Sequence, residues 1–200
     1  MKTGIVILAA GASTRMGQPK QLLPYQGSTL LRKTVATASS LGGPVVVVLG
    51  ANAGEVRGQL DDPRVLTAEN PCWSEGMGGS VRTGLGVLLA AHPEVAAVIF
   101  MVCDQPLISP AVLQDLIDEH SRTGRDIVAA QYSNALGVPA LFSSELFPEL
   151  LSLEGSCGAR QIIEKHRERA AEVSFPEAAM DIDTPCDFLT RAQLAIPVPA

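Results

Sequence analysis

Short unbroken runs of apolar residues most constrain how this chain can fold. Four runs, at 5–9, 45–49, 98–102 and 127–130, contain β-branched and other apolar residues without polar alternation. An unbroken apolar strand must be buried on both faces, which is typical of parallel sheets covered by helices on each side. The runs therefore predict the central strands of an α/β sheet.

Helical segments are expected between these strands. The sequence predicts helices over 29–40, 80–91 and 110–121. Ser109-Pro110 is a good helix start because serine caps free N–H groups and proline suits the first turn. Alternating strands and helices imply right-handed crossovers. We expect one Rossmann-like, three-layer α/β domain with a mostly parallel sheet over residues 1–194, followed by a loose tail over 195–200 rich in proline and alanine.

Charge and composition narrow the possible partners. The formal net charge of −6 repels phosphate polyanions, so no nucleic acid partner is expected. The apolar N-terminal run is too short for a membrane span or the apolar region of a signal peptide. We expect a cytoplasmic protein with no membrane partner. The four cysteines and three histidines are scattered, which predicts neither a disulfide framework nor a zinc site.

The loop after the first apolar run has the chemistry of an anion site. Ligands of such sheets bind at the carboxyl ends of strands. Residues 11–14 allow a tight turn with exposed N–H groups, and Arg15 and Lys20 add two positive charges. The loop is neither a Walker A motif nor a Gly-x-Gly-x-x-Gly motif. By its residues alone it is equally a phosphate-binding loop or a solvated turn.

The run Leu8-Ala-Ala-Gly-Ala-Ser-Thr-Arg-Met-Gly-Gln-Pro-Lys20 resembles the signature of the MobA-like nucleotidyltransferases, with Leu-Ala-Ala-Gly in place of Leu-Ala-Gly-Gly. Within that superfamily the chain is most similar to the molybdenum cofactor cytidylyltransferases. The similarity extends through nearly the whole chain and includes the segments 70–80, 104–106, 137–139, 158–160 and 181–187. The resemblance implies a Rossmann-like α/β domain, a nucleoside triphosphate substrate, Mg²⁺ and release of pyrophosphate.

The resemblance also implies roles for the nucleotide side. Arg15 and Lys20 would contact the triphosphate and, with Asp104, form the catalytic set, because negative charge builds on the leaving pyrophosphate. Ala10 replaces the glycine of guanylyl-transferring relatives, which favours cytosine in this family. The expected nucleotide-binding residues are Leu8, Ala9, Ala10, Gly11, Arg15, Lys20, Ser80 and Asp104.

Two aspartates are the expected metal ligands. Asp104 follows an apolar strand, where a carboxylate can hold Mg²⁺ together with phosphate oxygens and water. Asp183 is the expected second ligand and Asp181 the alternative; a turn or cap role is open for each. Thr184-Pro185 indicates a helix start with Asp187 in its first turn, so Asp187 is assigned to structure. A phosphate monoester acceptor, with a second pKa of about 6, needs no general base.

The acceptor side is expected along the glycine-rich segment 70–82, which leads into a helix whose N-terminus suits an anion. Trp73, Gly78 and Arg160 are the expected acceptor-binding residues, with core packing as the alternative for Trp73. Ser80 either caps the helix or binds ligand. Relatives carry Asp where Ser156 lies and commonly a polar residue where Val138 lies, and both departures concern the acceptor.

These observations favour an enzyme that transfers CMP from CTP to the phosphate of molybdopterin, a phosphorylated pterin cofactor, forming molybdopterin cytosine dinucleotide. A molybdoenzyme that receives the product is a further expected partner. Two alternatives stay open: a nucleotidyltransferase with another base or acceptor, such as GTP or a sugar phosphate, and a non-catalytic carrier of the molybdenum cofactor.

Overall fold

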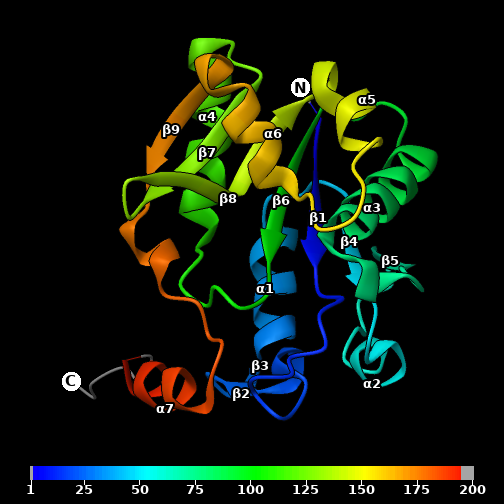
Figure 1. Ribbon diagram of the computed structural model, residues 1–200, viewed down its shortest axis with the longest axis vertical. Coiled ribbons are helices and arrows are strands. Elements are labelled where there is room, and N and C mark those ends of the chain that lie inside the picture. Colours follow the sequence, from blue (N-terminus) through cyan, green and yellow to red (C-terminus); the bar gives the residue numbers. More distant parts are fainter. Residues whose placement is uncertain (1, 195–200) are drawn as a thin grey trace.

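A seven-stranded sheet forms the centre of the protein (Figure 1). The computed structural model describes residues 2–194, so the predicted tail over 195–200 lies outside the described residues. The strand order is β5-β4-β1-β6-β8-β7-β9. The strands are β1 (Thr3–Leu8), β4 (Val45–Leu49), β5 (Val65–Glu69), β6 (Ala97–Val102), β7 (Ile127–Tyr132), β8 (Ala135–Ser143) and β9 (Ala170–Ser174).

The pairing in this sheet is mostly parallel, as predicted. Strand β1 pairs in parallel with both β4 and β6, β4 with β5, and β7 with β9. Only β8, among the described strands of this sheet, runs antiparallel to its neighbours β6 and β7. A separate two-stranded hairpin joins β2 (Pro24–Tyr25) and β3 (Ser28–Thr29).

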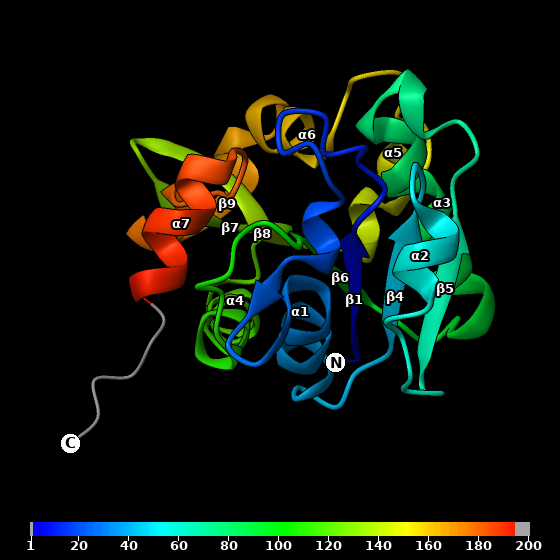
Figure 2. The same ribbon diagram turned by 90° about the horizontal axis from the view of Figure 1, so that it is seen from below.

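Helices cover both faces of the sheet and give the predicted three layers (Figure 2). Because successive side chains of a strand point to opposite faces, Val6 packs on one side and Ile7 on the other. The first face carries α3 (Met77–Ala91), α5 (Phe147–Leu150) and α6 (Ala159–Lys165). The second carries α1 (Leu30–Ser39) and α4 (Pro110–Thr123). The short α2 (Ala53–Arg57) follows β4, and α7 (Pro185–Leu194) ends the described chain.

The predicted helix starts are confirmed except at α3. Ser109 accepts a hydrogen bond from the Val112 backbone N–H at 3.4 Å, with proline next in the chain. Helix α3 begins at Met77 rather than at residue 80, because the glycines before it join the helix instead of forming a loop. The N-cap is Gly76, so the prediction that Ser80 caps this helix is wrong.

Three strands of the seven-stranded sheet, β5, β8 and β9, and the two hairpin strands β2 and β3 are absent from the sequence-based prediction. Strands β5 and β9 are the sheet edges and are partly exposed, so they lack an unbroken apolar run. Strand β8 contains Pro139, which would break a regular ladder. The β7–β8 register shifts between Ala129 and Ala130, whose partners are Ala140 and Gly137, so Pro139 lies in the irregularity.

Among residues 2–194, no helix combines the length and the apolar composition needed to cross a membrane.

Close packing of α3 on the sheet depends on Gly84. A Cβ at Gly84 would lie 2.5 Å from Val6 Cγ1 and 2.7 Å from Val48 Cγ2, whereas one at Gly86 in the same helix would meet nothing within 4 Å. We expect Gly84→Ala to lower the free energy of unfolding by about 1–3 kcal/mol through overpacking. Gly86→Ala should raise it by up to about 1 kcal/mol because alanine favours helix. Urea denaturation of both variants checks this, and equal effects would contradict it.

Candidate active site

The loop after β1 is held by a buried glutamine that the sequence did not indicate as functional. Gln21, in the short 3-10 helix Lys20–Leu22, is 1% exposed and donates through Nε2 to the carbonyl oxygens of Ala9 at 2.8 Å and Gly11 at 3.0 Å. Across residues 2–194, no hydrogen bond is donated by the backbone N–H groups of residues 10–15. A turn with several unpaired N–H groups is a suitable anion-binding cradle.

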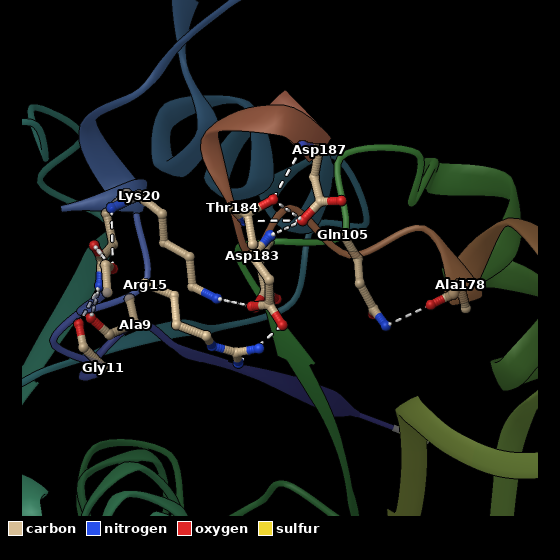
Figure 3. A network of polar contacts seen from close by, with 12 residues as sticks. Ala9, Gly11, Arg15, Lys20, Gln105, Ala178, Asp183, Thr184 and Asp187 are labelled. Carbon is tan, nitrogen blue, oxygen red and sulfur yellow. Dashed lines mark hydrogen bonds and ion pairs between the residues drawn. The ribbon is translucent and has the colours of Figure 1, made fainter. Parts of the chain in front are cut away.

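Lys20 lies between two carboxylates that come from distant parts of the chain (Figure 3). Its ammonium pairs with the carboxylate of Asp104 and lies 3.2 Å from Oδ1 of Asp183. Arg15 reaches the other oxygen of Asp183 at 3.0 Å. Burial lowers the pKa of Lys20, but the charge of Asp104 and the hydrogen bonds to both carboxylates outweigh it, so the pKa is raised. The structure thus brings together the four charged residues predicted for triphosphate and metal binding, Arg15, Lys20, Asp104 and Asp183.

Asp104 has one carboxylate oxygen without a partner. It follows the end of β6, and its side chain is 17% exposed. Oδ2 pairs with Lys20, whereas Oδ1 is buried and forms no hydrogen bond within the described part of the chain. An unsatisfied buried oxygen is costly and needs an explanation. A cation that takes this oxygen as a ligand would remove the cost.

The C-terminal segment brings Asp183 to this place through its neighbour Ile182. The Ile182 backbone N–H donates to the carbonyl of Asp104 at 2.9 Å. Its side chain is fully buried with Met16, Leu23 and Leu30 in a small core between the loop and the hairpin. Hydrophobic packing therefore ties Asp183 to the β1 loop.

The predicted helix start after Asp183 is confirmed. Oδ2 of Asp187 accepts from the backbone N–H groups of Asp183 at 3.2 Å and Thr184 at 2.8 Å, and from the Thr184 hydroxyl (Figure 3). The Asp187 N–H donates back to Thr184 Oγ1 at 3.2 Å. This is a capping box. Asp187 therefore has the structural role assigned to it.

The two carboxylates of Asp104 and Asp183 fit a magnesium-type ion. Within residues 2–194, no cluster of three or more His, Cys, Asp or Glu side chains forms a complete metal cage. Magnesium seldom needs one, because it binds through one or two carboxylates plus phosphate oxygens and water. The alternative ligand Asp181 is less suited to bind a cation. Burial first, and then the charge of Asp104, raise the pKa of its carboxyl group, which disfavours the charged form that binds metal.

A cavity of about 230 Å³ adjoins Lys20 and Asp104. Of the residues predicted for nucleotide binding, all but Arg15 line it, and Trp73 from the predicted acceptor set also lines it. Burial, followed by the charge of Asp104, raises the pKa of the lining thiol of Cys103 to about 12, so this thiol stays neutral. The lining residues are Leu8, Ala9, Ala10, Gly11, Lys20, Gln21, Trp73, Gly76, Met77, Ser80, Val102, Cys103 and Asp104.

Ser80 and Trp73 have structural contacts in addition to their place at this cavity. The Ser80 hydroxyl accepts a hydrogen bond from Asn70 Nδ2 at 3.0 Å, and Asn70 Oδ1 accepts from the Cys72 N–H at 3.1 Å. Trp73 is partly buried and packs against the core on the α3 face. Asn70 thereby holds the segment that carries Trp73 against the start of α3.

The two expected acceptor segments meet backbone to backbone. The Gly78 N–H donates to the Gly155 carbonyl at 3.1 Å. A Cβ at Gly76 would lie 2.3 Å from that same oxygen, and one at Gly78 would lie 2.9 Å from the Cys157 carbonyl, so only glycine allows this approach. Gly78 therefore contacts the 154–158 segment and does not line the cavity.

Arg160 is not part of the cavity wall. Its side chain is 65% exposed and pairs with Glu164, one turn later in α6, at 3.0 Å. The structure thus separates Arg160 from the other predicted site residues.

A larger cavity of about 500 Å³ lies between α1 and the segment 59–65. Its two arginines already have partners: Arg32 pairs with Asp61 at 3.0 Å and Arg64 with Asp62 at 2.8 Å. Lys20 at the smaller cavity is paired as well, but within residues 2–194 that cavity also adjoins the buried, unsatisfied Oδ1 of Asp104 and the unpaired N–H groups of the β1 loop. The smaller cavity is therefore the candidate active site.

Comparison with known proteins identifies the family. The family model described as MobA-like NTP transferase domain matches residues 5–170. The chain belongs to this family. It is an enzyme of the nucleotidyltransferase type, and the family implies a nucleoside triphosphate substrate. The resemblance inferred from the loop after β1 is thereby confirmed.

Individual relatives differ in activity. The chain is 39% identical to nicotine blue oxidoreductase of Paenarthrobacter nicotinovorans over 168 residues, 78% of each chain. It is 24% identical to the molybdenum cofactor cytidylyltransferase of Escherichia coli K12 over 190 residues, 94% of each. A crystal structure of Rv0371C from Mycobacterium tuberculosis with manganese has a TM-score of 0.77 at 30% identity, covering 98% of this chain and 100% of that one.

Ile182 is expected to stabilise the C-terminal segment strongly. Ile182→Ala should lower the free energy of unfolding by about 2–5 kcal/mol, because it removes a fully buried side chain from the small core. The matched control is Leu189→Ala in α7, whose side chain is 65% exposed and whose loss should change stability by less than about 0.5 kcal/mol. Guanidinium denaturation measures both, and a small effect at Ile182 would contradict its anchoring role.

Proposed function

We propose that this enzyme transfers CMP from CTP to the phosphate of molybdopterin, forming molybdopterin cytosine dinucleotide and pyrophosphate. The single observation that carries the proposal is the juxtaposition of the unpaired loop N–H groups, Lys20 and the unsatisfied Asp104 oxygen beside one cavity. Donors for an anion and a ligand for a cation are what a triphosphate with its metal requires.

The proposed reaction has one bond-making and one bond-breaking step at the α-phosphorus. An oxygen of the acceptor phosphate attacks the α-phosphorus, the bond to the bridging oxygen breaks, and pyrophosphate leaves with the bond electrons. The acceptor is already a dianion near neutral pH, since its second pKa is about 6, so no side chain has to remove a proton. The protein's task is to position the groups and to neutralise charge.

The charged residues divide this task. Asp104 and Asp183 would hold a divalent ion, which supplies positive charge to the phosphate oxygens. Lys20 then exchanges its carboxylate partners for the triphosphate. The side chain of Arg15 is 72% exposed, so its guanidinium group can move from Asp183 to bind the leaving pyrophosphate. Leu8, Ala9, Ala10 and Gly11 would contact base and ribose. Of the residues predicted for the acceptor, Trp73 alone lines the cavity and would contact the acceptor there.

One residue supports a cytosine base. Ala10, where guanylyl-transferring relatives have glycine, is 6% exposed and lines the cavity. Similarity to the Escherichia coli cytidylyltransferase over 94% of both chains supports the pterin acceptor.

Binding of nucleotides tests the base assignment. In isothermal titration with Mg²⁺, we expect CTP to bind at least about tenfold more tightly than GTP or ATP, a difference of about 1.4 kcal/mol. Equal affinities would overturn the choice of CTP and retain the triphosphate site. Failure to bind any of the three would overturn the triphosphate site itself.

Pyrophosphate release tests the role of Asp104. We expect Asp104→Asn to slow release from CTP and molybdopterin by about 100-fold or more, because it removes a metal-binding charge beside the reacting phosphates. Asp115→Asn, at an exposed position of α4, is the matched control and should leave the rate unchanged. Comparable rates for the two variants would remove Asp104 from the mechanism. Faster release with GTP or a sugar phosphate would replace the proposed substrates.

A second candidate function is favoured by the 39% identity to nicotine blue oxidoreductase, which exceeds the identity to the cytidylyltransferase. The diphosphate of a nicotinamide dinucleotide is also an anion that loop N–H groups can hold. Oxidation of NADH or NADPH by this chain in the presence of nicotine blue, without pyrophosphate release from any nucleotide, would establish this function in place of the first.

A further inference from the structure

The side-chain amide of Gln21 bridges the two limbs of the β1 loop. It lines the cavity yet is 1% exposed. Nε2 donates to two loop carbonyls, Ala9 O at 2.8 Å and Gly11 O at 3.0 Å. Oε1 accepts from the Ser13 hydroxyl at 3.4 Å. All three of these hydrogen bonds join the Gln21 amide to the loop after β1.

These contacts determine how two peptide units of the loop are oriented. A trans peptide is planar, and its C=O and N–H point in opposite directions. When the carbonyl of Ala9 points to Gln21, the N–H of Ala10 points away from it. The Gly11 carbonyl orients the N–H of Ala12 in the same way. Both N–H groups belong to the stretch 10–15, whose backbone donors make no hydrogen bond within the described part of the chain.

The same network reaches Lys20. Ser13, which donates to Gln21, accepts from the Lys20 backbone N–H at 3.0 Å. Ser13 has a φ of +54°, a left-handed conformation that is costly for a residue with a side chain and needs support from its surroundings. The Ser13 hydroxyl therefore couples the Gln21 amide to the backbone of the residue that carries the central ammonium.

We propose that Gln21 is a positioning residue for the triphosphate. It holds the peptide units of Ala9 and Gly11 so that the N–H of Ala10 faces the nucleoside and the N–H of Ala12 donates to the β- or γ-phosphate. Through the Ser13 hydroxyl it also fixes the backbone position of Lys20. The proposal rests on the proposed function, in which this loop binds a nucleoside triphosphate. Its chemistry is specific to an amide, because no other uncharged side chain of this length offers two N–H donors.

Substitution of Gln21 separates positioning from simple core packing. Gln21→Met keeps nearly the same volume but removes both donors, so the two carbonyls lose their partner and the peptide units are released. Gln21→Glu keeps the shape and places a carboxylate against two carbonyls and beside the phosphates. Gln161→Glu, at an exposed position in α6, makes the same change of charge away from the loop and is the matched control.

The experiment compares CTP with CMP by isothermal titration in Mg²⁺, with the melting temperature of each variant recorded. CMP lacks the two phosphates that the loop is proposed to hold. We expect Gln21→Met to weaken CTP binding about tenfold or more and CMP binding less than about threefold. Gln21→Glu should weaken CTP further, and the control should change neither. A pure packing role would lower the melting temperature and leave the ratio of the two affinities unchanged.

The outcomes distinguish this inference from the function on which it rests. Wild-type protein that binds CTP, together with Gln21 variants that retain the wild-type ratio of CTP to CMP affinity, overturns the positioning role alone. Wild-type protein that binds no nucleoside triphosphate overturns both. If Gln21→Met does not fold, Gln21→Glu decides, because its side chain has the shape of the native one.

Discussion

The ammonium of Lys20 between the carboxylates of Asp104 and Asp183 is the interaction on which the candidate site depends. It joins the loop after β1, which carries Lys20, to the end of β6 and to the segment before α7. Asp104 and Asp183 lie 84 and 163 residues after Lys20 along the chain. Opposite charges in a partly buried place attract strongly and are screened little. The same arrangement leaves Oδ1 of Asp104 buried with no hydrogen-bond partner among the described residues, so one acceptor of the site is free for a ligand.

Neutral, buried residues hold these charges in position. Ile182 ties the Asp183 segment to the loop through a small apolar core and to Asp104 through a backbone hydrogen bond. The side-chain amide of Gln21 binds carbonyl groups of the loop after β1. The capping box of Thr184 and Asp187 fixes the backbone at the start of α7, next to Asp183. Polar side chains that act on a ligand need such support, because a misplacement of about 1 Å weakens catalysis strongly.

The proposed acceptor side has fewer charged contacts than the proposed nucleotide side. Glycines at positions 76 and 78 let the start of α3 approach the 154–158 segment so closely that no side chain fits between them. That segment carries Ser156 and leads into α6 with Arg160. The nucleotide side, in contrast, contains a lysine, an arginine and two aspartates in contact.

The sequence by itself determined the strands β1, β4, β6 and β7 and the layered α/β architecture, and its motifs indicated that Arg15, Lys20, Asp104 and Asp183 belong to one site. Short unbroken apolar runs rich in β-branched residues are typical of buried strands, Ser109-Pro110 marks a helix start by local chemistry, and the motif from Leu8 to Lys20 indicates the family. Only the tertiary structure decided the edge strands β5 and β9, the extent of α3, the place of Arg160 outside the cavity and the role of Gln21. These depend on contacts between distant segments: a glutamine at the start of a short helix shows no local pattern, and it gains its role from the two carbonyls that folding places within reach of its amide.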